Sequence, residues 1–469
     1  MEALTTELAV IGAGPGGYAA AFYAADLGMK VTLVDEGKAL GGVCLNRGCI
    51  PSKALLHVAR LLEEAREAQT FGIGFGPPSI DLAKLRSFKN DVVTRLNGGI
   101  HTLAKARKVA VAHGRARFLA PDLIEVTGGE GPAQLRFRQA IIATGSRPIL
   151  PPALRLDSPR VLDSTGALEL PDIPAEFLLV GGGIIGLELG SVYAALGSKV
   201  TVIEALADLA TPVDRDLFRP LEKRLKERFK AVHLNCRVAG MEERGARIHV
   251  RYEQAGRNEE ADFDRVLLCI GRRPNTENLG LENVGVALDE RGFIKADKTL
   301  RTSAPNIFAI GDAIGNPMLA HKASREARVA VEALLGKRSV FDNVALPNVI
   351  YTDPEIAWVG LTENEAKKEG REHKVSRFPW AASGRALASG RSEGLTKVLF
   401  DPQSERLLGV GICGINAGEL IAEATLALEM GCVVGDITGT IHAHPTLAET
   451  FMESAEAFHG LATHLVARK

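Results

Sequence analysis

The sequence predicts an α/β protein with two Rossmann-like dinucleotide-binding domains followed by a C-terminal α+β domain. One pattern of strand, glycine-rich turn, helix, strand and acidic residue occurs twice, with turns that begin at Gly12 and at Gly181. From Leu346 onward the pattern changes to short apolar strands followed by two helices. A chain of 469 residues has room for two to four domains.

The first unit begins with the apolar strand 8–11 and the glycine turn GAGPGG at 12–17. An alanine-rich helix runs to about residue 27, and the strand 31–34 ends at Asp35. In such a unit Gly12 makes the tight turn, Gly14 lets a pyrophosphate approach the backbone, and Gly17 lets helix and strand pack closely. The helix N-terminus faces the phosphates, and Asp35 can accept a hydrogen bond from a ribose hydroxyl.

The second unit repeats this order, with strand 177–180, turn GGGIIG at 181–186, helix 187–196 and strand 200–203. Gly181, Gly183 and Gly186 occupy the three glycine positions, and Glu204 ends the second strand. A carboxylate there binds a ribose 2′-hydroxyl and repels a 2′-phosphate, and residues 205–207 contain no arginine. NAD is therefore favoured over NADP. Two nucleotide sites in one chain indicate electron transfer between two nucleotides.

The stretch GGVCLNRGCIPSK, residues 41–53, places Cys44 and Cys49 five residues apart. In a continuous helix this spacing gives a rise of about 7.5 Å, whereas the Cα atoms of a disulfide lie about 4.4–6.8 Å apart. If the two cysteines pair, the helix must be bent or must not yet have begun. Nearby glycines permit such a backbone, and Pro51 disfavours the α conformation at Ile50. The alternative is two unrelated buried thiols.

Composition narrows the class of protein and its location. The net charge of −1 offers no basic stripe for nucleic acid and no acidic tail for a charged partner. Six cysteines in a chain of this length indicate a reducing compartment rather than a disulfide framework. Glu2 and Glu7 precede the first basic residue, Lys30, which is the wrong charge order for a signal peptide. The most apolar run, 177–197, contains Glu188 and several glycines, unlike a membrane span. We therefore expect a cytoplasmic protein.

The segment IHAHPTLAE, residues 441–449, contains two histidines two residues apart. Metal binding is one interpretation, but no third ligand stands at a recognised zinc spacing, so we predict no metal site. A structural histidine pair is another. The favoured interpretation is a general base, His444, oriented by Glu449. Thr446 and Glu449 also match the capping box of the last predicted helix, 446–460, so the two roles compete for one carboxylate.

Several motifs, in this order along the chain, resemble those of the flavoprotein disulfide reductases, and most closely the dihydrolipoamide dehydrogenase branch. They are GGVCLNRGCIPSK at 41–53, QAIIATGSRP at 139–148, GRRPNT at 271–276, IFAIGD at 307–312, MLAHKA at 318–323 and YTDPE at 351–355. The resemblance implies an FAD-binding domain in two parts, 1–148 and 272–345, and an NAD-binding domain, 149–271. It also implies a C-terminal interface domain, 346–469, that pairs two chains into a homodimer.

The resemblance implies FAD on the first domain and NAD on the second. The family usually has glutamate where this chain has Asp35, so contact through a water and replacement by Glu36 are both open. Asp312 would bind the flavin ribitol, with an ordinary turn as the alternative. The implied cofactor-binding residues are Gly12, Gly14, Pro15, Gly17, Asp35, Glu36, Gly42, Lys53, Gly114, Thr144, Gly145, Gly181, Gly183, Gly186, Glu188, Glu204, Gly271, Arg272, Gly311, Asp312, Met318, Leu319, Ala320 and His321.

The implied catalytic centre is a redox-active disulfide between Cys44 and Cys49. His444 would take a thiol proton from dihydrolipoamide, because only a thiolate attacks a disulfide efficiently. The substrate would attack Cys44, and Cys49, nearer the flavin, would pass electrons to FAD and on to NAD. The implied catalytic residues are Cys44, Cys49, His444, Glu449, Lys53 and Glu188.

Two of these residues have simpler alternatives. Glu188 stands in an apolar helix, and a buried acid needs a partner, which by resemblance is Lys53. Lys53 could instead be a solvated helix lysine. Arg47, within the cysteine stretch, departs from the smaller apolar residue usual in the family.

The predicted activity is NAD-dependent reoxidation of protein-bound dihydrolipoamide. Its implied partners are the lipoyl domains and acyltransferase core of a 2-oxo acid dehydrogenase complex, or the lipoyl carrier of glycine cleavage. One alternative is a flavin reductase of the same architecture acting on another disulfide, a quinone or a metal ion. Another is a docking subunit with incidental diaphorase activity. The presence of both cysteines, His444 and Glu449 argues against the docking subunit, since docking needs none of them.

Overall fold

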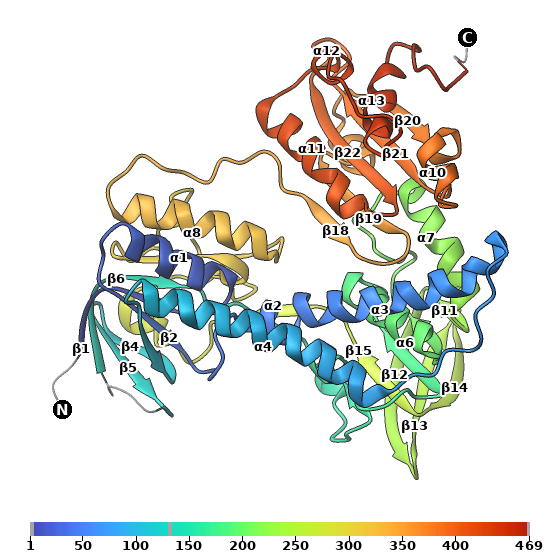
Figure 1. Ribbon diagram of the computed structural model, residues 1–469. Coiled ribbons are helices and arrows are strands. Elements are labelled where there is room, and N and C mark those ends of the chain that lie inside the picture. Colours follow the sequence, from blue (N-terminus) through green and yellow to red (C-terminus); the bar gives the residue numbers. More distant parts are fainter. Residues whose placement is uncertain (1–3, 130–133, 467–469) are drawn as a thin grey trace.

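The computed structural model describes residues 4–129 and 134–466, which form three lobes (Figure 1). The first lobe, at the left, contains β1 and α1 and receives α8 from much later in the chain. The second lobe, at the lower right, contains α6, and the third, above it, is built from the last quarter of the chain. The prediction of an α/β fold with two Rossmann-like units and a C-terminal α+β domain is confirmed.

The first lobe is built on a seven-stranded sheet in the order β3-β2-β1-β6-β5-β4, with β17 also paired to β6. Its centre is parallel, and Val10 of β1 lies between Leu33 of β2 and Ile141 of β6. All three side chains are fully buried, as expected for a parallel sheet covered on both faces. The strands are β1 (Leu4–Ile11), β2 (Val31–Asp35), β3 (Ala110–His113), β4 (Arg115–Ala120), β5 (Leu123–Thr127), β6 (Gln134–Ile142) and β17 (Ile307–Ala309).

Helices from two distant parts of the chain, residues 15–106 and residues 320–334, cover this sheet. The alanine-rich α1 packs against α8, so residues some 300 positions apart share one core. Gly114, whose φ is 146°, separates β3 from β4. The helices are α1 (Pro15–Asp26), α2 (Gly42–Arg47), α3 (Cys49–Glu67), α4 (Leu82–Ala106) and α8 (Ala320–Leu334), with short 3-10 turns η1 (Ala68–Phe71), η3 (Leu281–Val284) and η4 (Gly311–Ile314).

The second lobe repeats the Rossmann arrangement in a parallel sheet of order β11-β10-β9-β15-β8. Phe177 of β9 packs on Tyr193 of α6, with ring centroids 4.4 Å apart. A three-stranded antiparallel meander, β12-β13-β14, follows the sheet. The elements are β8 (Val161–Leu162), α5 (Ser164–Leu168), β9 (Glu176–Val180), α6 (Ile184–Leu196), β10 (Lys199–Ile203), α7 (Arg215–Arg228), β11 (Ala231–His233), β12 (Cys236–Arg244), β13 (Arg247–Gln254), β14 (Arg257–Phe263) and β15 (Arg265–Leu268).

A two-stranded ribbon marks the passage between the first two lobes. β7 (Ser146–Pro148) carries the chain out and β16 (Arg272–Pro274) brings it back, and the two pair antiparallel. The linker also holds the short turn η2 (Pro152–Leu154). The long helices α3 and α4 run from the first lobe toward the second (Figure 1), and α3 packs along α6. The cysteine stretch at the start of α3 therefore lies where the lobes meet.

The third lobe is an antiparallel sheet of order β18-β19-β22-β21-β20 with helices beside it. Trp380 is fully buried, and its Nε1 donates to Thr396 Oγ1 at 3.0 Å. The elements are β18 (Asn348–Ile350), β19 (Glu355–Gly360), α9 (Glu363–Glu369), β20 (Lys374–Pro379), η5 (Trp380–Ala382), α10 (Gly384–Ala388), β21 (Leu395–Phe400), β22 (Leu407–Gly414), α11 (Ala417–Met430), α12 (Val434–Thr438) and α13 (Glu449–Glu456).

The prediction for the last helix is wrong at its start. α13 begins at Glu449 with Ala448 as its N-cap, not at Thr446. The Thr446 hydroxyl donates backward to the carbonyl of Ala443 at 2.8 Å, so it caps no helix. Only half of the expected box forms, because the Thr446 N–H donates to Glu449 Oε2 at 2.7 Å.

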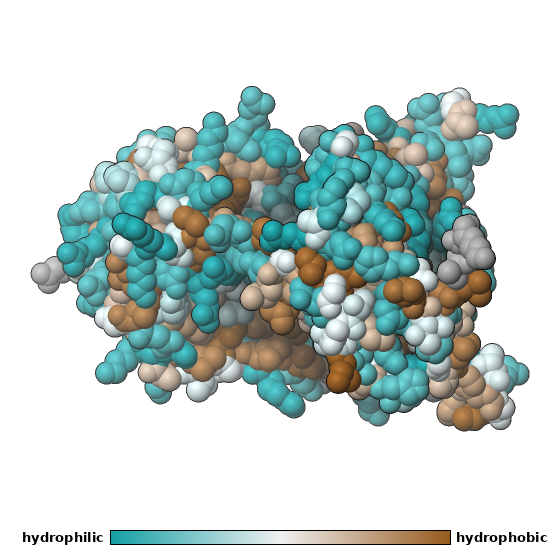
Figure 2. Space-filling model, turned by 90° about the horizontal axis from the view of Figure 1, so that it is seen from above, coloured by the Kyte–Doolittle hydropathy of each residue, from teal (hydrophilic) through white to brown (hydrophobic). Residues whose placement is uncertain are grey.

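The surface is mainly hydrophilic, with separate hydrophobic patches near the middle of the face seen in Figure 2. Among exposed apolar side chains of the third lobe, Leu426, Met430 and Ile441 stand out, and Ile441 is 97% exposed. Within the described ranges, none of the helices combines the length and apolarity that crossing a bilayer would require.

Candidate active site

Each Rossmann unit turns at a glycine where a side chain would collide with the backbone. Gly12 has φ 100°, and a Cβ there would lie 2.3 Å from the Ala143 carbonyl oxygen. Gly181 has φ 103°, and a Cβ there would lie 2.4 Å from the Cys269 carbonyl oxygen. The turns thus use glycine for close packing as well as for conformation.

The middle glycine of each turn faces open space instead. A Cβ on Gly14 or Gly183 would meet nothing within 4 Å, and each of these residues is the N-cap of the helix that follows. Neither helix has a side-chain cap or an acidic residue in its first turn, so its N–H groups are free to bind an anion. Near the first turn, the buried Thr144 Oγ1 has no hydrogen-bond partner. These features fit two dinucleotides.

The two acidic residues bind the main chain in matching ways. Asp35 accepts from the Ala13 N–H at 2.6 Å and the Gly37 N–H at 2.7 Å. Glu204 accepts from the Gly182 N–H at 2.6 Å and the Leu206 N–H at 2.7 Å. Burial raises the pKa of Asp35, and its two backbone donors oppose that shift. Each carboxylate therefore fixes the turn beside which a ribose would lie.

Glu36 and Gly114 lie near Asp35 but differ in setting. The Glu36 side chain is exposed, 3.8 Å from Arg115, whereas the Gly114 N–H donates to the carbonyl of Asp35 at 2.8 Å.

Asp312 lies at the passage between the first two lobes. The Ser146 hydroxyl donates to Asp312 Oδ2 at 2.5 Å, and Arg272 Nε donates to Ser146 Oγ at 2.8 Å. Gly145 and Gly271, both with positive φ, join the same ribbon, where the Asn275 and Ile149 N–H groups donate to their carbonyls. The sequence did not single out Ser146, which links the two charged residues.

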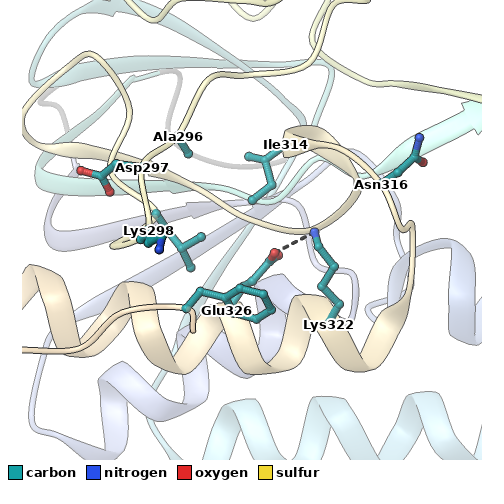
Figure 3. Close-up of a pocket in the computed structure, with 9 residues that line it drawn as sticks. Ala296, Asp297, Lys298, Ile314, Asn316, Lys322 and Glu326 are labelled. Carbon is teal, nitrogen blue, oxygen red and sulfur yellow. Dashed lines mark ion pairs between the residues drawn. The ribbon is translucent and has the colours of Figure 1, made fainter. Parts of the chain in front are cut away.

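A buried ion pair supports the turn that carries Asp312. Glu326 accepts from the Gly311 N–H at 2.7 Å and lies 2.7 Å from Lys322 Nζ. Figure 3 shows Lys322 and Glu326 pointing toward one another beside a cavity of about 250 Å³.

Residues 318–321 begin α8 next to the third lobe. Leu319 is the N-cap, and His321 Nε2 lies 2.8 Å from the Pro347 carbonyl. Burial lowers the pKa of His321, and its hydrogen bond to the Pro347 carbonyl opposes that shift. Met318 and Ala320 lie on either side of this N-cap position. The start of α8 is thus uncapped by any side chain and available to a ligand.

The cysteine stretch forms two helices with a break between them. α2 ends at Arg47, Gly48 has φ −150° and ψ −110°, and α3 begins at Cys49. The cysteines therefore lie on either side of a bend, as pairing requires. A Cβ on Gly42 would lie 2.5 Å from Gly14 Cα, so the cysteine helix is seated directly against the first glycine turn.

Both cysteines are free thiols in this structure, and they are unlike one another. The hydrogen bond between them, with the Cys44 thiol as donor, lowers the pKa of Cys49 to about 7. Lys53, one turn further along α3, lowers it as well, while burial opposes the shift. The same hydrogen bond and burial raise the pKa of Cys44 far above its usual range. Near pH 7 about half of the pairs therefore carry a thiolate at Cys49, while Cys44 keeps its proton.

Lys53 and Glu188 form the charged pair beside the cysteines. Lys53 Nζ donates to Glu188 Oε2 at 2.9 Å, and the Ser52 hydroxyl donates to the same oxygen at 3.1 Å. The other oxygen, Oε1, accepts from the N–H of Tyr351 at 3.0 Å. Glu188 is 4% exposed, so these three donors are what make its burial tolerable. Neither Ser52 nor Tyr351 was predicted as a site residue, although Ser52 lies in the motif at 41–53 and Tyr351 in the motif at 351–355.

His444 and Glu449 form a second pair in the third lobe. His444 Nδ1 lies 2.9 Å from Glu449 Oε1, and the other carboxylate oxygen accepts from Thr446 N–H. One carboxylate therefore holds both the His444 ring and the Thr446 main chain, although it does not form the helix cap that the sequence predicted. The N–H of Thr446 and His444 both lower the pKa of Glu449. A carboxylate on Nδ1 leaves Nε2 to exchange protons, and the imidazole is 75% exposed.

The two pairs do not meet within one chain. Over residues 4–129 and 134–466, no hydrogen bond or ion pair joins His444 or Glu449 to Cys44 or Cys49. His442, by contrast, is tied down, with Nε2 2.7 Å from Glu423 Oε1 and Nδ1 2.9 Å from the Thr440 carbonyl.

One acidic cluster has the ligand spacing of a metal site, but a lysine lies within it. Asp214, Asp216 and Glu363 present oxygens close together. Lys397 Nζ lies 2.6–2.9 Å from all three and is 1% exposed. The cluster joins the second lobe to the third.

Together, the twin nucleotide turns and the thiol pair define a pyridine nucleotide-disulfide oxidoreductase. The family model described as pyridine nucleotide-disulphide oxidoreductase matches residues 6–327, and its dimerisation domain matches residues 346–455.

Whole-chain relatives specify the family further. A dihydrolipoyl dehydrogenase of Vibrio cholerae is 48% identical over 98% of this chain and 97% of its own length. One from Thermus scotoductus is 48% identical over 99% of this chain and 100% of its own. The chain belongs to the dihydrolipoyl dehydrogenase family.

Solved structures agree in fold. LpdA from Mycobacterium tuberculosis superposes with a TM-score of 0.89 at 27% identity, covering 96% of this chain and 99% of that one. The HOCl-induced flavoprotein disulfide reductase RclA from Escherichia coli gives a TM-score of 0.87 at 29% identity, covering 97% and 99%.

These findings confirm the sequence-based predictions of family, enzyme class and cofactors. The chain is an oxidoreductase that acts on sulfur donors and uses FAD and NAD.

Proposed function

We propose that the chain reoxidises protein-bound dihydrolipoyl groups at a site made from two chains. One chain supplies Cys44 and Cys49, and His444 and Glu449 come from its partner. The observation that carries this proposal is that each pair is well formed in one chain yet the two are not in contact. The family dimerisation domain over residues 346–455 and the exposed apolar side chains of the third lobe support assembly through that lobe.

The reaction begins with proton removal from the substrate. His444, held through Nδ1 by Glu449, accepts a thiol proton at Nε2 and releases a substrate thiolate. That thiolate attacks Cys44 Sγ of the oxidised pair, breaking its bond to Cys49 and forming a mixed disulfide. The second substrate thiol passes its proton to solvent and, as a thiolate, displaces Cys44, which leaves as a thiol with the proton returned by His444. The substrate becomes a disulfide, and the cysteine pair has gained two electrons.

The two cysteines divide the work according to their acidity. Cys49, with its pKa near 7, is the better leaving group and stays as thiolate. Cys44, with its raised pKa, holds the proton and remains the exchange partner. Bound FAD would supply the two-electron redox chemistry between the reduced pair and NAD. The first glycine turn, Thr144 and Asp312 would hold FAD, and Lys53 with Glu188 would lie beside its ring.

Coenzyme choice and partners extend the proposal. Glu204 favours NAD over NADP because a 2′-phosphate would meet its carboxylate. The lipoyl domains of a 2-oxo acid dehydrogenase complex, or of glycine cleavage, are the proposed substrates, and the cytoplasm is the proposed compartment. The domain limits 1–148, 149–271, 272–345 and 346–469 are likewise proposed.

Reduction of NAD by free dihydrolipoamide tests the proposal. The wild type should reduce NAD, whereas Cys44→Ser and His444→Gln should lose about a thousandfold or more in kcat/KM, because the nucleophilic exchange or its base is gone. The matched control is His442→Gln, at a histidine anchored to Glu423 rather than to Glu449. Activity of Cys44→Ser with dihydrolipoamide equal to wild type would refute the proposed role of the pair.

A further inference from the structure

Three parts of the chain meet at the ammonium group of Lys53. Lys53 belongs to α3 of the first lobe, Glu188 to α6 of the second, and Tyr351 to the turn between β18 and β19 of the third. Lys53 Nζ lies 2.9 Å from Glu188 Oε2 and 4.4 Å from the centroid of the Tyr351 ring. The Tyr351 N–H donates to the other oxygen of Glu188 at 3.0 Å.

We propose that Tyr351 is a positioning residue that holds the Lys53 ammonium beside the cysteine pair through the face of its ring. A cation over an aromatic ring at this distance is attracted by the negative face of the π-system. Lys53 is on a flexible side chain that is 34% exposed, so the ion pair with Glu188 alone leaves it room to swing into solvent. The ring closes that side. This role rests on the proposed function of Cys49 as the thiolate of the pair.

Tyr351 is itself fixed at two points. Its main chain is held by Glu188, and the edge of its ring faces α11, where a Cβ on Gly418 would lie 3.5 Å from Tyr351 Cε1. The Gly418 N–H in turn donates to Glu355 Oε2 at 2.9 Å. Tyr351, which is 38% exposed, is thus bounded by α11 at the edge of its ring and by Lys53 at the face. The third lobe therefore contributes to the thiol site within its own chain, in addition to presenting His444.

The consequence is chemical, because Lys53 lowers the pKa of both cysteines. The charged or titratable groups that face Cys49 are Cys44 on α2, Lys53 on α3, Glu188 on α6, Arg272 on β16, Tyr18 on α1 and Tyr351. Of these, Lys53 and Arg272 are cations, and Lys53 is the one that the tyrosine ring contacts. If the ammonium swings away, the Cys49 thiolate loses a stabilising charge while the opposing Glu188 stays.

The test compares Tyr351→Leu with Tyr351→Phe in the purified holoenzyme. The reduced enzyme is alkylated with iodoacetamide across a pH series, and modification of Cys49 is followed by mass spectrometry. Tyr351→Phe keeps the ring face and should keep the wild-type midpoint near pH 7. Tyr351→Leu should move the midpoint upward by about half a pH unit. In a protein that already carries Lys53→Met, Tyr351→Leu should not move the midpoint further, because the ring acts through the Lys53 ammonium.

Equal midpoints for the leucine and phenylalanine variants would overturn the proposal, as would an unchanged leucine effect in the Lys53→Met background. Thermal unfolding reports whether the leucine variant is folded. If it is not, replacement of Tyr351 by pentafluorophenylalanine keeps the size of the ring and reverses the charge of its face, and the same upward shift is expected. A different result would count against the proposed function itself: Cys44 rather than Cys49 would be the more acidic thiol in the wild type.

Discussion

The two Rossmann units of this chain share one backbone device and differ in what surrounds it. In both, a carboxylate at the end of the second strand accepts from the second residue of the glycine turn, Ala13 or Gly182, at 2.6 Å. In both, the other oxygen of the carboxylate accepts from the N–H of the residue two positions after the acid, Gly37 or Leu206, at 2.7 Å. The device fixes the glycine turn beside which each dinucleotide is proposed to lie.

The two units differ in the residues that lie beside their glycine turns. The first turn has the cysteine helix seated against Gly14 through Gly42, so redox-active thiols lie next to it. The second turn is followed by Glu188, whose carboxylate reaches back to Lys53 of the first unit. The two units are not independent modules, because each supplies a charge to the same thiol site. Since different residues lie beside the two glycine turns, a substitution in the first turn should give a different defect from the matching substitution in the second.

The largest effect is expected from Gly17→Ala in the first unit. The added Cβ would lie 1.8 Å from the Gly12 carbonyl oxygen, so the glycine turn must move. We expect the flavin content, measured by absorbance after gel filtration, to fall about tenfold or more, since overpacking of this kind costs about 1–3 kcal/mol or more. Gly99→Ala, on α4 with nothing within 4 Å of its Cβ, is the control and should keep its flavin. Full flavin in Gly17→Ala would contradict the packing role of the glycine.

Gly186→Ala, the matching change in the second unit, should be milder and of another kind. Its Cβ would lie 2.6 Å from the Gly181 carbonyl oxygen and 3.0 Å from Leu179 Cδ1. We expect the protein to stay yellow while KM for NAD rises about tenfold, which corresponds to about 1.4 kcal/mol. Steady-state kinetics with the flavin content measured in parallel would check this. Loss of flavin without a change in KM would mean that the assignment of the two units is reversed.

A smaller effect is expected when the second carboxylate loses its charge. Glu204→Gln combined with Ala205→Arg should reduce the preference for NAD over NADP by about tenfold or more, because the repulsion of a 2′-phosphate disappears. The ratio of the kcat/KM values for the two coenzymes is the measurement. Asp35→Asn serves as the contrast, and it should leave that ratio unchanged. A wild type that used both coenzymes equally well would show that Glu204 does not select.

Local sequence patterns predicted the two Rossmann units well. The glycine turns, their strands and the acids that end them follow from residue spacing, because each unit is contiguous in sequence. The bend between the cysteines was predicted in part: it lies at Gly48, where glycine permits it, whereas Ile50, at which Pro51 was expected to disfavour the α conformation, lies within α3.

What the sequence could not give are contacts between segments far apart. The N–H of Tyr351 on Glu188 joins residues 163 positions apart, and no periodicity encodes it. Lys397 among three carboxylates is a similar case. Only half of the capping box at Thr446 forms, because the Thr446 hydroxyl donates back to the Ala443 carbonyl and the helix begins only at Glu449. Tertiary contacts decided the first two of these positions.

Cysteines of the two units should differ in their response to pH. The pKa of Cys49 is lowered to about 7 by Cys44 and Lys53, whereas burial raises the pKa of Cys269 to about 12. In the reduced enzyme, alkylation of Cys49 should rise about tenfold per pH unit below pH 7 and level off above it, because the thiolate is the reacting form. Cys269 should stay unmodified up to pH 9. Mass spectrometry of both peptides is the measurement, and equal reactivity at pH 7 would contradict the assignment.

Mixed dimers show whether the thiol pair of one chain works with the base of the other. Cys49→Ser and His444→Gln chains, each inactive with dihydrolipoamide as homodimers, are unfolded and refolded together. Random pairing makes about half of the dimers mixed, and in each of these one shared site is intact and the other carries both lesions. About a quarter of all sites should therefore work, and activity should return to roughly a quarter of the wild-type value. No recovery, with mixed dimers demonstrated by mass spectrometry, would contradict the shared site and place thiols and base in the same chain.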